Sequence, residues 1–474
     1  MATVKSSTRS RKRTRAPSRA ASIQSINPAT GEVLESFPEI GKRELDRVLD
    51  QADRAYRDWR RRPLGERTAL LREAAKVLRS GKATYARAMA LEMGKPLAQG
   101  EAETEKCAAV CDYYADNAAA FLAHQPRELD GTRSYVRFDP IGAVLAVMPW
   151  NFPFWQVFRF AAPALAGGNV GLLKHASNVT RCALLIEAVF RDAGFPDGTF
   201  RTLVLRSQGV AGVIADPRVR AVTLTGSELA GSQVAEQAGH HLKKTVLELG
   251  GSDAFIVLAD ADLARAAKTA ADARLINSGQ SCIAAKRFIV VEAVADRFTE
   301  RFVTEMRSRM MGDPLAPATQ VGPQARPELR DELHRQVERS VRRGAGLLLG
   351  GAIPKGPGAF YPPTVLGDVK PGMPAFDEEV FGPAAAVVRA RDDADAVRLA
   401  NASPYGLGAA VWTEDRPRAE RVAAELEAGC VFINGLVRSD PRLPFGGVKR
   451  SGYGRELSEY GMREFLNIKS VCVA

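Results

Sequence analysis

The sequence predicts an α/β fold in which parallel sheets are covered by helices on both faces. From residue 141 onward, short apolar runs alternate with segments of helical periodicity. The runs are continuously apolar, as expected of strands that are buried on both faces. The chain has 474 residues, of which 46% are hydrophobic and 26% charged, so it can bury the cores of two or three globular domains.

Helices are predicted through most of the first 122 residues. The spacing of apolar residues places them over 44–59, over 66–79, in a segment that ends near Gly94, and over 99–122. On the last of these helices, Cys107 and Cys111 lie on one face. A metal site would need further His or Cys ligands, so we expect this pair to belong to the hydrophobic core.

Strands and helices are predicted to alternate from residue 141 to residue 433. The expected strands are 141–148, 170–173, 221–225, 254–258, 288–291, 384–388, 409–412 and 430–433. The expected helices are 179–193, 227–238, 262–278 and 295–311. Segment 351–374 is rich in Gly and Pro and is expected to form a loop within the second half of the chain, not a domain boundary.

Much of the net positive charge lies at the N-terminus. Residues 1–22 carry seven Lys or Arg side chains and no acid, so of the net charge of +11 about +4 remains for the rest of the chain. We expect residues 1–22 to form a disordered, solvated tail because they contain almost no apolar side chains. A polyanion-binding arm or a targeting segment is the alternative. Because the remainder is nearly balanced in charge, no nucleic-acid partner is expected.

A membrane segment is not expected either. Residues 140–158 are uncharged over nearly the length of a membrane span, but Pro149 and Pro153 interrupt them, and a proline inside a helix costs about 3 kcal/mol. Six cysteines without paired spacing indicate free thiols in a reducing compartment. A cytoplasmic protein is therefore predicted.

Several common functional motifs are absent from the sequence. It contains no G-x-G-x-x-G, no G-x-x-x-x-G-K-[ST], no H-E-x-x-H and no G-x-S-x-G. The usual dinucleotide fingerprint, the phosphate loop, the zinc protease and the α/β-hydrolase therefore have no support. The five histidines are scattered, so no metal site is predicted.

Two residues stand in surroundings that suit catalysis. Cys282 follows small polar residues and Gly279, which allows a ligand to approach, although most cysteines are simply buried hydrophobes. Glu248 lies within an apolar run, where an unpaired carboxylate is costly. It is interpreted either as the ion-pair partner of Lys243 or Lys244, or as a general base with a pKa raised by its apolar surroundings.

Two further segments could bind negatively charged groups. Asn151 follows the predicted strand 141–148 and could donate to an oxyanion, or it could belong to a rigid Pro-rich turn. Gly226 and Ser227 open a helix after strand 221–225. Free N–H groups at a helix start bind anions, although an ordinary capped helix start explains the same residues.

In combination, the motifs resemble those of the aldehyde dehydrogenase superfamily over residues 24–474. They are MPWNFPFW (148–155), LLKHASN (172–178), LTGSELAG (224–231), LELGGSD (247–253), GQSC (279–282), EEVFGP (378–383) and PFGGVKRSGYGRE (444–456). The resemblance implies an α/β fold with a Rossmann-type dinucleotide-binding domain, an α/β catalytic domain and a small oligomerisation element that pairs chains into homodimers or homotetramers. Their expected bounds are 23–119 with 139–249, then 250–449, and 120–138 with 450–474.

The resemblance also implies NAD(P)-dependent oxidation of an aldehyde to a carboxylic acid through a cysteine thioester. Cys282 would be the nucleophile, Asn151 with the backbone N–H of Cys282 would hold the oxyanion, and Glu248 would activate the hydrolytic water. NADP or NAD would be the cofactor. The implied cofactor-binding residues are Trp150, Lys174, Ser177, Gly226, Ser227, Leu249, Glu379 and Phe381.

The coenzyme segment departs from a pattern common among NAD-preferring members. Those members carry Lys-Pro-x-Glu with the Glu on the adenosine ribose, whereas this chain has Lys174-His175-Ala176-Ser177. A carboxylate 4 Å from a 2′-phosphate would repel it by roughly 1–4 kcal/mol. Ser177 removes that repulsion, and Lys174 with His175 could attract the phosphate. We therefore expect NADP to be accepted, with NAD use still open.

The substrate is indicated by a closer resemblance to the succinate-semialdehyde dehydrogenase branch of the superfamily, in its bacterial short type. The segments that carry it are 154–159, KHASN and FINGLVRSD (432–440). Arg159 would clamp the distal carboxylate of succinate semialdehyde or, alternatively, form a surface ion pair. Ser439 lies on the loop expected to cover the aldehyde tunnel.

Three alternatives to this function stay open. The substrate could be another small or carboxylated aldehyde. The enzyme could transfer the acyl group to CoA, although that class usually lacks the base at Glu248. Less well supported is a non-catalytic polyanion-binding protein on the same fold.

Overall fold

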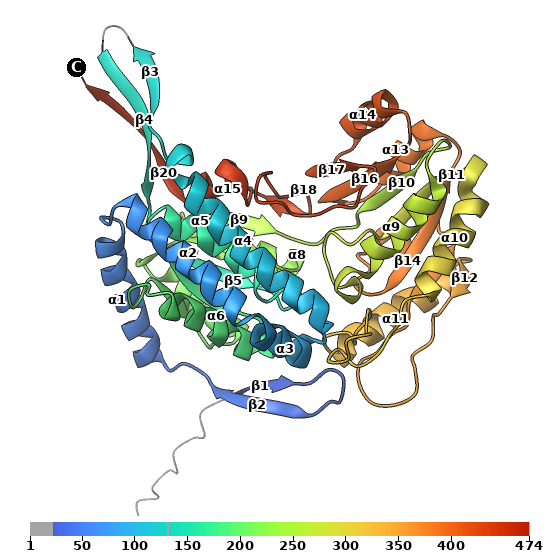
Figure 1. Cartoon of the computed structure of the whole chain (residues 1–474), viewed down its shortest axis with the longest axis horizontal. Coiled ribbons are helices and arrows are strands. Elements are labelled where there is room, and N and C mark those ends of the chain that lie inside the picture. The colour runs from blue at the N-terminus through green and yellow to red at the C-terminus, as the bar shows by residue number, and fades with distance from the viewer. Residues whose placement is uncertain (1–21, 130–131, 474) are drawn as a thin grey trace, which may run out of the picture.

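The computed structural model describes residues 22–129 and 132–473, which form two lobes around two large sheets (Figure 1). The predicted basic tail lies outside the described residues, except for Ser22, which begins a strand. The α/β prediction is confirmed, because each large sheet is mainly parallel and alternates with helices along the chain. Within the described residues, no helix combines the length and the apolar character needed to cross a bilayer.

The first large sheet has the strand order β19-β9-β8-β5-β6-β7. Its parallel strands are β5 (Ala143–Met148), β6 (Val170–His175), β7 (Phe200–Thr202), β8 (Val219–Thr225) and β9 (Lys244–Glu248), and β19 (Gly452–Tyr453) is antiparallel to β9. The chain starts in the centre at β5, adds β6 and β7 on one side, and then returns to add β8 and β9 on the other. The reversal between β5 and β8 is a topological switch point, where open α/β sheets bind ligands at the carboxyl ends of their strands.

Helices cover this sheet on both faces. They are α1 (Lys42–Trp59), α2 (Leu64–Ser80), α3 (Lys82–Met93), α4 (Leu97–Phe121), α5 (Trp155–Ala166), α6 (Thr180–Asp192), α7 (Val210–Ala215) and α8 (Glu228–His240). Helices α5 and α6 both contact α2, whereas α7 contacts α8. The two groups of helices lie on opposite faces of the sheet, as right-handed crossovers to the two sides of β5 require. Cys107 and Cys111 are fully buried on α4, in the hydrophobic core of this lobe.

The second large sheet has the order β12-β13-β14-β11-β10-β16-β17. Its strands are β10 (Ala254–Val257), β11 (Arg287–Val291), β12 (Gly346–Leu349), β13 (Thr364–Gly367), β14 (Ala384–Ala390), β16 (Gly408–Trp412) and β17 (Cys430–Ile433). All neighbours are parallel except β12 and β13. Its helices are α9 (Leu263–Leu275), α10 (Ala295–Arg307), α11 (Pro327–Arg342), α12 (Pro374–Asp377), α13 (Asp393–Asn401) and α14 (Arg416–Glu425).

A third sheet projects from the first lobe and carries the C-terminal end of the described chain (Figure 1). It consists of the antiparallel strands β3 (Gln125–Leu129), β4 (Thr132–Pro140) and β20 (Leu466–Val473), with α15 (Ser458–Glu464) directly before β20. The sequence did not predict these strands, because β3 and β20 are largely exposed and show no continuous apolar run. The division into domains is not tested by this arrangement and stays a prediction.

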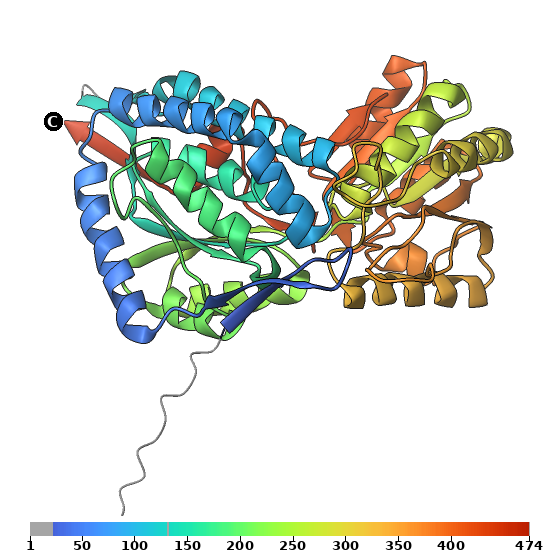
Figure 2. The ribbon, with the colours of Figure 1, turned by 60° about the horizontal axis from the view of Figure 1, so that its bottom comes forward.

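Two short strand pairs complete the described part of the fold. The hairpin of β1 (Ser22–Ile26) and β2 (Val33–Pro38) runs below the first lobe toward the second (Figure 2). The strands β15 (Tyr405–Gly406) and β18 (Val448–Lys449) form a short antiparallel pair. The prediction that 351–374 is a loop is wrong in part, because β13 lies inside it and pairs with β14 through the apolar residues Val365 and Leu366.

Candidate active site

Most of the predicted site residues lie at the carboxyl edge of the first sheet, on both sides of its switch point. Asn151 follows β5, Ser177 follows β6, Ser227 follows β8 and Glu248 ends β9. Parallel strands end at one edge, so the topology alone brings together residues up to about 100 positions apart in the chain. This edge faces the amino ends of β10 and β11 in the second lobe, because the chain passes from β9 into β10 through only five residues.

Cys282 is presented by a tight turn between α9 and β11. Asn277, Ser278 and Gly279 have φ values of 53°, 56° and 76°, so three successive residues adopt the left-handed conformation. Gly279 is also required sterically, because a Cβ there would lie 2.2 Å from the carbonyl group of Gly382. The turn leaves Cys282 partly exposed while its neighbours 277–281 are buried.

Two buried cations hold this segment through its carbonyl groups. Arg274 donates to the carbonyl oxygen of Gly279 at 2.7 Å. The Lys286 ammonium donates to the carbonyl oxygens of Ser281, Cys282 and Ala284 at 3.0, 2.7 and 3.1 Å. A fully buried ammonium normally requires such partners. The segment 279–284 therefore has its backbone direction fixed by side chains that come from outside the turn.

Burial raises the pKa of the Cys282 thiol to about 12, while the nearby cations Lys286 and Arg159 act against this increase. The thiol is thus protonated at neutral pH in the cofactor-free protein. A further positive charge at this point would favour the thiolate, which is the nucleophilic form.

The Asn151 amide lies against the same segment. Its Nδ2 donates to the carbonyl oxygen of Gln280 at 3.2 Å, and the carbonyl oxygen of Asn151 accepts from Asn277 Nδ2 at 2.7 Å. Asn151 is only 5% exposed. These contacts place an amide donor beside the residues that immediately precede Cys282, which is what an oxyanion-binding role requires.

Glu248 is buried at the end of β9 without a hydrogen-bond partner among the described residues. The proposed ion pairs are wrong: Lys244 pairs with Glu464, and Lys243 donates to backbone carbonyl oxygens near Asp216. Burial and the nearby Glu456 carboxylate raise the pKa of Glu248 well above its ordinary value. A carboxylate with a raised pKa binds a proton more strongly than an exposed one, which suits a general base.

Glu248 and the Cys282 segment approach each other through the glycines after β9. A Cβ on Gly251 would lie 2.7 Å from the carbonyl oxygen of Cys282, so no larger residue fits there. Gly446 likewise approaches Glu248, with a Cβ position 2.7 Å from its Oε1. The backbone three residues after the predicted base thus lies against the carbonyl oxygen of the predicted nucleophile.

Arg159 lies on the helix after the Asn151 loop, as predicted, but it has a carboxylate partner within the protein. It lies on α5, is 2% exposed, and forms an ion pair with the buried carboxylate of Glu456. Its guanidinium carbon lies 4.8 Å from the centre of the Phe445 ring. The alternative of a surface ion pair is wrong, because both partners are buried. The clamp on a substrate carboxylate stays a prediction.

The predicted nicotinamide-side residues meet beside the nucleophile. The rings of Trp150 and Phe381 pack edge to face with centres 5.7 Å apart. Glu379 accepts from the backbone N–H of Gly251 at 2.9 Å, and its carboxylate lies 3.7 Å from Lys286 Nζ. Lys286 therefore connects this carboxylate with the carbonyl oxygen of Cys282.

The adenosine-side residues lie at the end of β6. The Lys174 ammonium is largely buried and, within the described chain, forms no hydrogen bond or ion pair, so a positive charge is available there for an anionic ligand. The attraction expected from His175 is wrong. Both its ring nitrogens are bonded to backbone groups, Nε2 to the carbonyl oxygen of Pro153 and Nδ1 to the N–H of Ala176. Burial lowers its pKa to about 4, so the ring is neutral.

The start of α8 presents backbone N–H groups at the same edge. Ser227 is the N-cap and its side chain accepts from the N–H of Ala230. Gly231 is needed one turn later, because a Cβ there would lie 2.5 Å from Leu249 Cδ2. The side chain of Leu249 thus packs against α8, the helix that begins directly after Gly226 and Ser227.

A cavity of about 550 Å³ opens beside the nucleophile segment. Its lining includes Phe152, which follows Asn151, and Ile276, which precedes Asn277. Gln99 on α4 lines the cavity and also accepts from the backbone N–H of Asn277 at 2.8 Å. The cavity is mainly apolar, as sites for small organic ligands commonly are.

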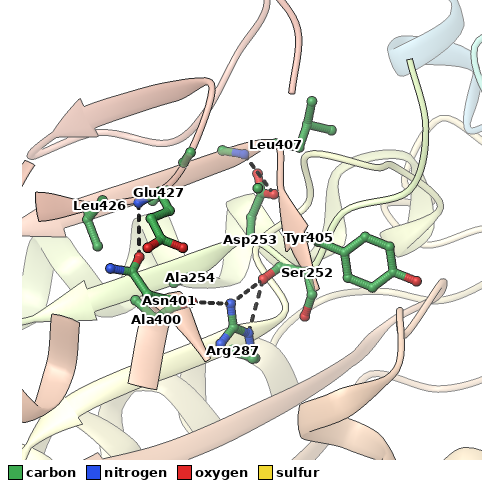
Figure 3. A pocket seen from close by; sticks show the side chains of 14 residues that line it. Ser252, Asp253, Ala254, Arg287, Ala400, Asn401, Tyr405, Leu407, Leu426 and Glu427 are labelled. Carbon is green, nitrogen blue, oxygen red and sulfur yellow. Dashed lines mark hydrogen bonds between the residues drawn. The ribbon is translucent and has the colours of Figure 1, made fainter. Parts of the chain in front are cut away.

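A second, much smaller cavity of about 20 Å³ is lined by Ser252 and Asp253, which directly follow Gly250 and Gly251 in the chain (Figure 3). Arg287 donates to the carbonyl oxygen of Ser252, and Asp253 Oδ1 accepts from the N–H of Gly408 at 3.1 Å. Burial raises the pKa of Asp253 to about 7. The space is large enough for a water molecule and too small for the substrate. No group of His, Cys, Asp and Glu in the described part of the chain could hold a metal ion.

The fold and these residues define an aldehyde dehydrogenase. The sequence model of the aldehyde dehydrogenase family matches residues 15–471, and the chain belongs to this family. The resemblance and the enzyme class expected from the motifs are confirmed.

The relatives are more specific. A probable succinate-semialdehyde dehydrogenase [NADP(+)] of Synechocystis sp. is 48% identical over 95% of this chain and 100% of its own length. Succinate-semialdehyde dehydrogenase [NADP(+)] 1 of Mycobacterium tuberculosis (strain H37Rv) is 50% identical with the same shares. The crystal structure of succinic semialdehyde dehydrogenase from Streptococcus pyogenes, in complex with NADP+, is 40% identical over 95% of this chain and 99% of that chain, with a TM-score of 0.93.

Three charged residues of the site were missed by the sequence analysis. Arg274 and Lys286 resemble ordinary surface cations in the sequence, and Glu456 was noticed only as part of a motif. Arg274 and Lys286 flank the GQSC motif, and a cation close to an expected nucleophile was the one available signal. Nothing in the sequence indicated that Glu456 would neutralise Arg159.

Replacing Lys286 with Met is expected to slow alkylation of Cys282 at pH 8 by about tenfold or more, because loss of an adjacent positive charge raises a thiol pKa by about one unit. The rate is measured with iodoacetamide on the cofactor-free protein by mass spectrometry of the Cys282 peptide. The exposed Cys472 is the internal reference. Lys286→Arg should keep most of the wild-type rate. Equal Cys282 rates in wild type and Lys286→Met would contradict the electrostatic role.

Proposed function

We propose that the chain oxidises succinate semialdehyde to succinate, with NADP or NAD as the hydride acceptor. The observation that carries the chemistry is the contact of the Asn151 amide with the Cys282 segment, together with Gly251, three residues after the buried Glu248, against the carbonyl oxygen of Cys282. The substrate and coenzyme are supported by the relatives, which carry the names of NADP-dependent succinate-semialdehyde dehydrogenases at 48–50% identity over nearly their whole length.

The residues at the carboxyl edge fit a dinucleotide. The unpartnered Lys174 ammonium and the Ser177 hydroxyl would hold the adenosine ribose and its phosphate, and the N–H groups at Gly226 and Ser227 would face the pyrophosphate. Glu379 would bind the nicotinamide ribose. The apolar walls would be Phe381, Trp150 and Leu249. The bound nicotinamide supplies the acceptor for the hydride that leaves the substrate carbon.

The first half of the reaction uses Cys282. The thiol first loses its proton to water. The thiolate sulfur then attacks the aldehyde carbon, the C=O electron pair moves onto oxygen, and Asn151 Nδ2 with the Cys282 N–H would donate to that oxygen. Loss of a hydride from the same carbon re-forms the C=O bond and leaves a thioester on Cys282. The hydrogen bonds from Lys286 to the Cys282 segment would hold the sulfur and the two oxyanion donors in fixed positions relative to each other.

The second half uses Glu248. As a carboxylate it would take a proton from water, whose oxygen attacks the thioester carbon, and the C–S bond then breaks to release succinate. The raised pKa of Glu248 makes it a stronger base than an exposed carboxylate. Because the deprotonated form is the active one, hydrolysis is expected to accelerate as the pH rises through that pKa.

The oligomeric state of the protein and its location in the cell are part of the same proposal. We propose a homodimer or homotetramer, with the sheet of β3, β4 and β20 as the pairing element, which is supported by its exposed antiparallel strands. A cytoplasmic location is supported by six free cysteines.

The direct test is a spectrophotometric comparison of aldehydes with each coenzyme. Succinate semialdehyde should give a kcat/KM at least about tenfold above that of butanal, equivalent to about 1.4 kcal/mol of transition-state binding. The product should be succinate whether or not CoA is present. Formation of a CoA ester, or equal kcat/KM values for succinate semialdehyde and butanal, would refute the proposal.

Glu248→Gln is expected to separate the two halves of the reaction. The amide fills the same space but cannot accept a proton, so steady-state turnover should fall by about 10²–10⁴-fold. A burst of reduced coenzyme, equal to one turnover per site, should remain in stopped-flow measurements. A loss of burst and turnover together would show that Glu248 acts before the thioester forms.

Ser177→Glu is expected to shift the coenzyme preference from NADP toward NAD. A carboxylate at this position would repel a 2′-phosphate by roughly 1–4 kcal/mol, which is about 5- to 1000-fold in the ratio of the two kcat/KM values. Ser177→Ala serves as the neutral control and should change the ratio much less. If Ser177→Glu left the ratio of the two kcat/KM values unchanged, the adenosine ribose would have to bind elsewhere.

A further inference from the structure

The loop between β5 and α5, which carries Asn151, is held by a carboxylate from α4. Glu103 Oε1 accepts from the backbone N–H groups of Phe154 and Trp155, both at 2.9 Å. These groups lie at the start of α5, where N–H groups have no partner within the helix and no local side chain caps them. Trp155 Nε1 in turn donates to Ser439 Oγ at 3.1 Å. Glu103 thus supplies, from 51 positions earlier in the chain, the acceptor that a local cap would otherwise supply.

Lys95 compensates the charge of this carboxylate. It forms an ion pair with Glu103 Oε2, and the two side chains are only 1% and 2% exposed. Burial lowers the pKa of Lys95, and the charge of Glu103 acts against this effect. Lys95 Nζ also lies 3.9 Å from the centre of the ring of Phe152, which directly follows Asn151. Without Lys95, an uncompensated buried carboxylate would lie close to a site where negative charge must develop.

The orientation of Asn151 depends on side chains from other elements. Asn151 and Phe152 belong to no helix or strand, so no regular backbone hydrogen bonding fixes their direction. On one side, the amide and the carbonyl oxygen of Asn151 contact the nucleophile segment. On the other side, the Phe152 ring and the N–H groups at the start of α5 contact the pair of Lys95 and Glu103. A shift of this pair would therefore move the amide relative to the reacting sulfur.

We propose that Glu103, supported by Lys95, is a positioning residue for the first half of the reaction. It fixes the loop so that Asn151 Nδ2 points to the substrate oxygen that becomes negative. This inference rests on the proposed function, and it concerns how the oxyanion donor is held. Removing such a donor slows catalysis by about 10²–10³-fold, and a misplacement of about 1 Å can cost about 10²-fold. Loss of Glu103 should therefore slow thioester formation and leave the reactivity of the thiol itself unchanged.

A second buried carboxylate caps a helix in the same way without contacting the Asn151 loop. Glu92 on α3 accepts from the N–H groups of Arg181 and Cys182 near the start of α6, both at 2.9 Å. It is 2% exposed. Because α6 follows β6 and not β5, removal of this cap changes stability without displacing the oxyanion donor. Glu92 is therefore a matched control for Glu103.

The test compares two double variants of the full-length enzyme. Lys95→Met/Glu103→Gln, the acceptor variant, and Lys95→Met/Glu103→Met, the acceptor-free variant, both lose the two buried charges. Only Glu103→Gln keeps an oxygen that can accept from the two N–H groups. With enzyme in excess over NADP+, succinate semialdehyde should reduce the coenzyme about 10- to 100-fold more slowly in the acceptor-free variant. Alkylation of Cys282 by iodoacetamide needs no oxyanion donor and should occur at the same rate in both, which also shows that both are folded.

Asn151→Ala separates positioning from a general loss of stability. In this background the acceptor and acceptor-free variants should have equal single-turnover rates, because the donor that they would displace is absent. Glu92→Met removes the matched cap and should lower the Tm without slowing the single-turnover rate.

The inference is overturned if the two double variants react equally fast with Asn151 present, or if their difference persists in Asn151→Ala. If the acceptor-free variant does not fold, Glu103→Gln alone takes its place, and its slowing must likewise disappear in Asn151→Ala. A wild-type enzyme that does not reduce the coenzyme with succinate semialdehyde would instead refute the proposed function. The two failures are therefore distinguishable.

Discussion

The buried cations that hold the nucleophile segment are the constraint on which the rest of the site depends. Asn277 and Ser278 are left-handed although neither is glycine, and each such residue costs roughly 1–2 kcal/mol. The segment keeps this conformation because Arg274 and Lys286 donate to its carbonyl groups from outside the turn. If the clamp relaxed, Cys282 would lose its place beside the Asn151 amide, and catalysis depends steeply on such positioning.

The electrostatics of the site are arranged so that little charge exists before ligands bind. Burial raises the pKa of both the Cys282 thiol and the Glu248 carboxyl. The charges that are present are mostly paired, as in Lys286 with Glu379 and Arg159 with Glu456. Lys174, at the end of β6, has no such partner among the described residues and lies where a dinucleotide phosphate would enter.

The sequence predicted those parts of the molecule that depend on local patterns. Buried strands such as β10, β11 and β16 were found because both faces are covered, which produces continuous apolar runs. The exposed strands β3 and β20 gave no such signal. The ion-pair partner of Arg159 was missed for a related reason. Its partner Glu456 is almost 300 residues away, and a sequence pattern contains no information about a pairing that tertiary structure creates.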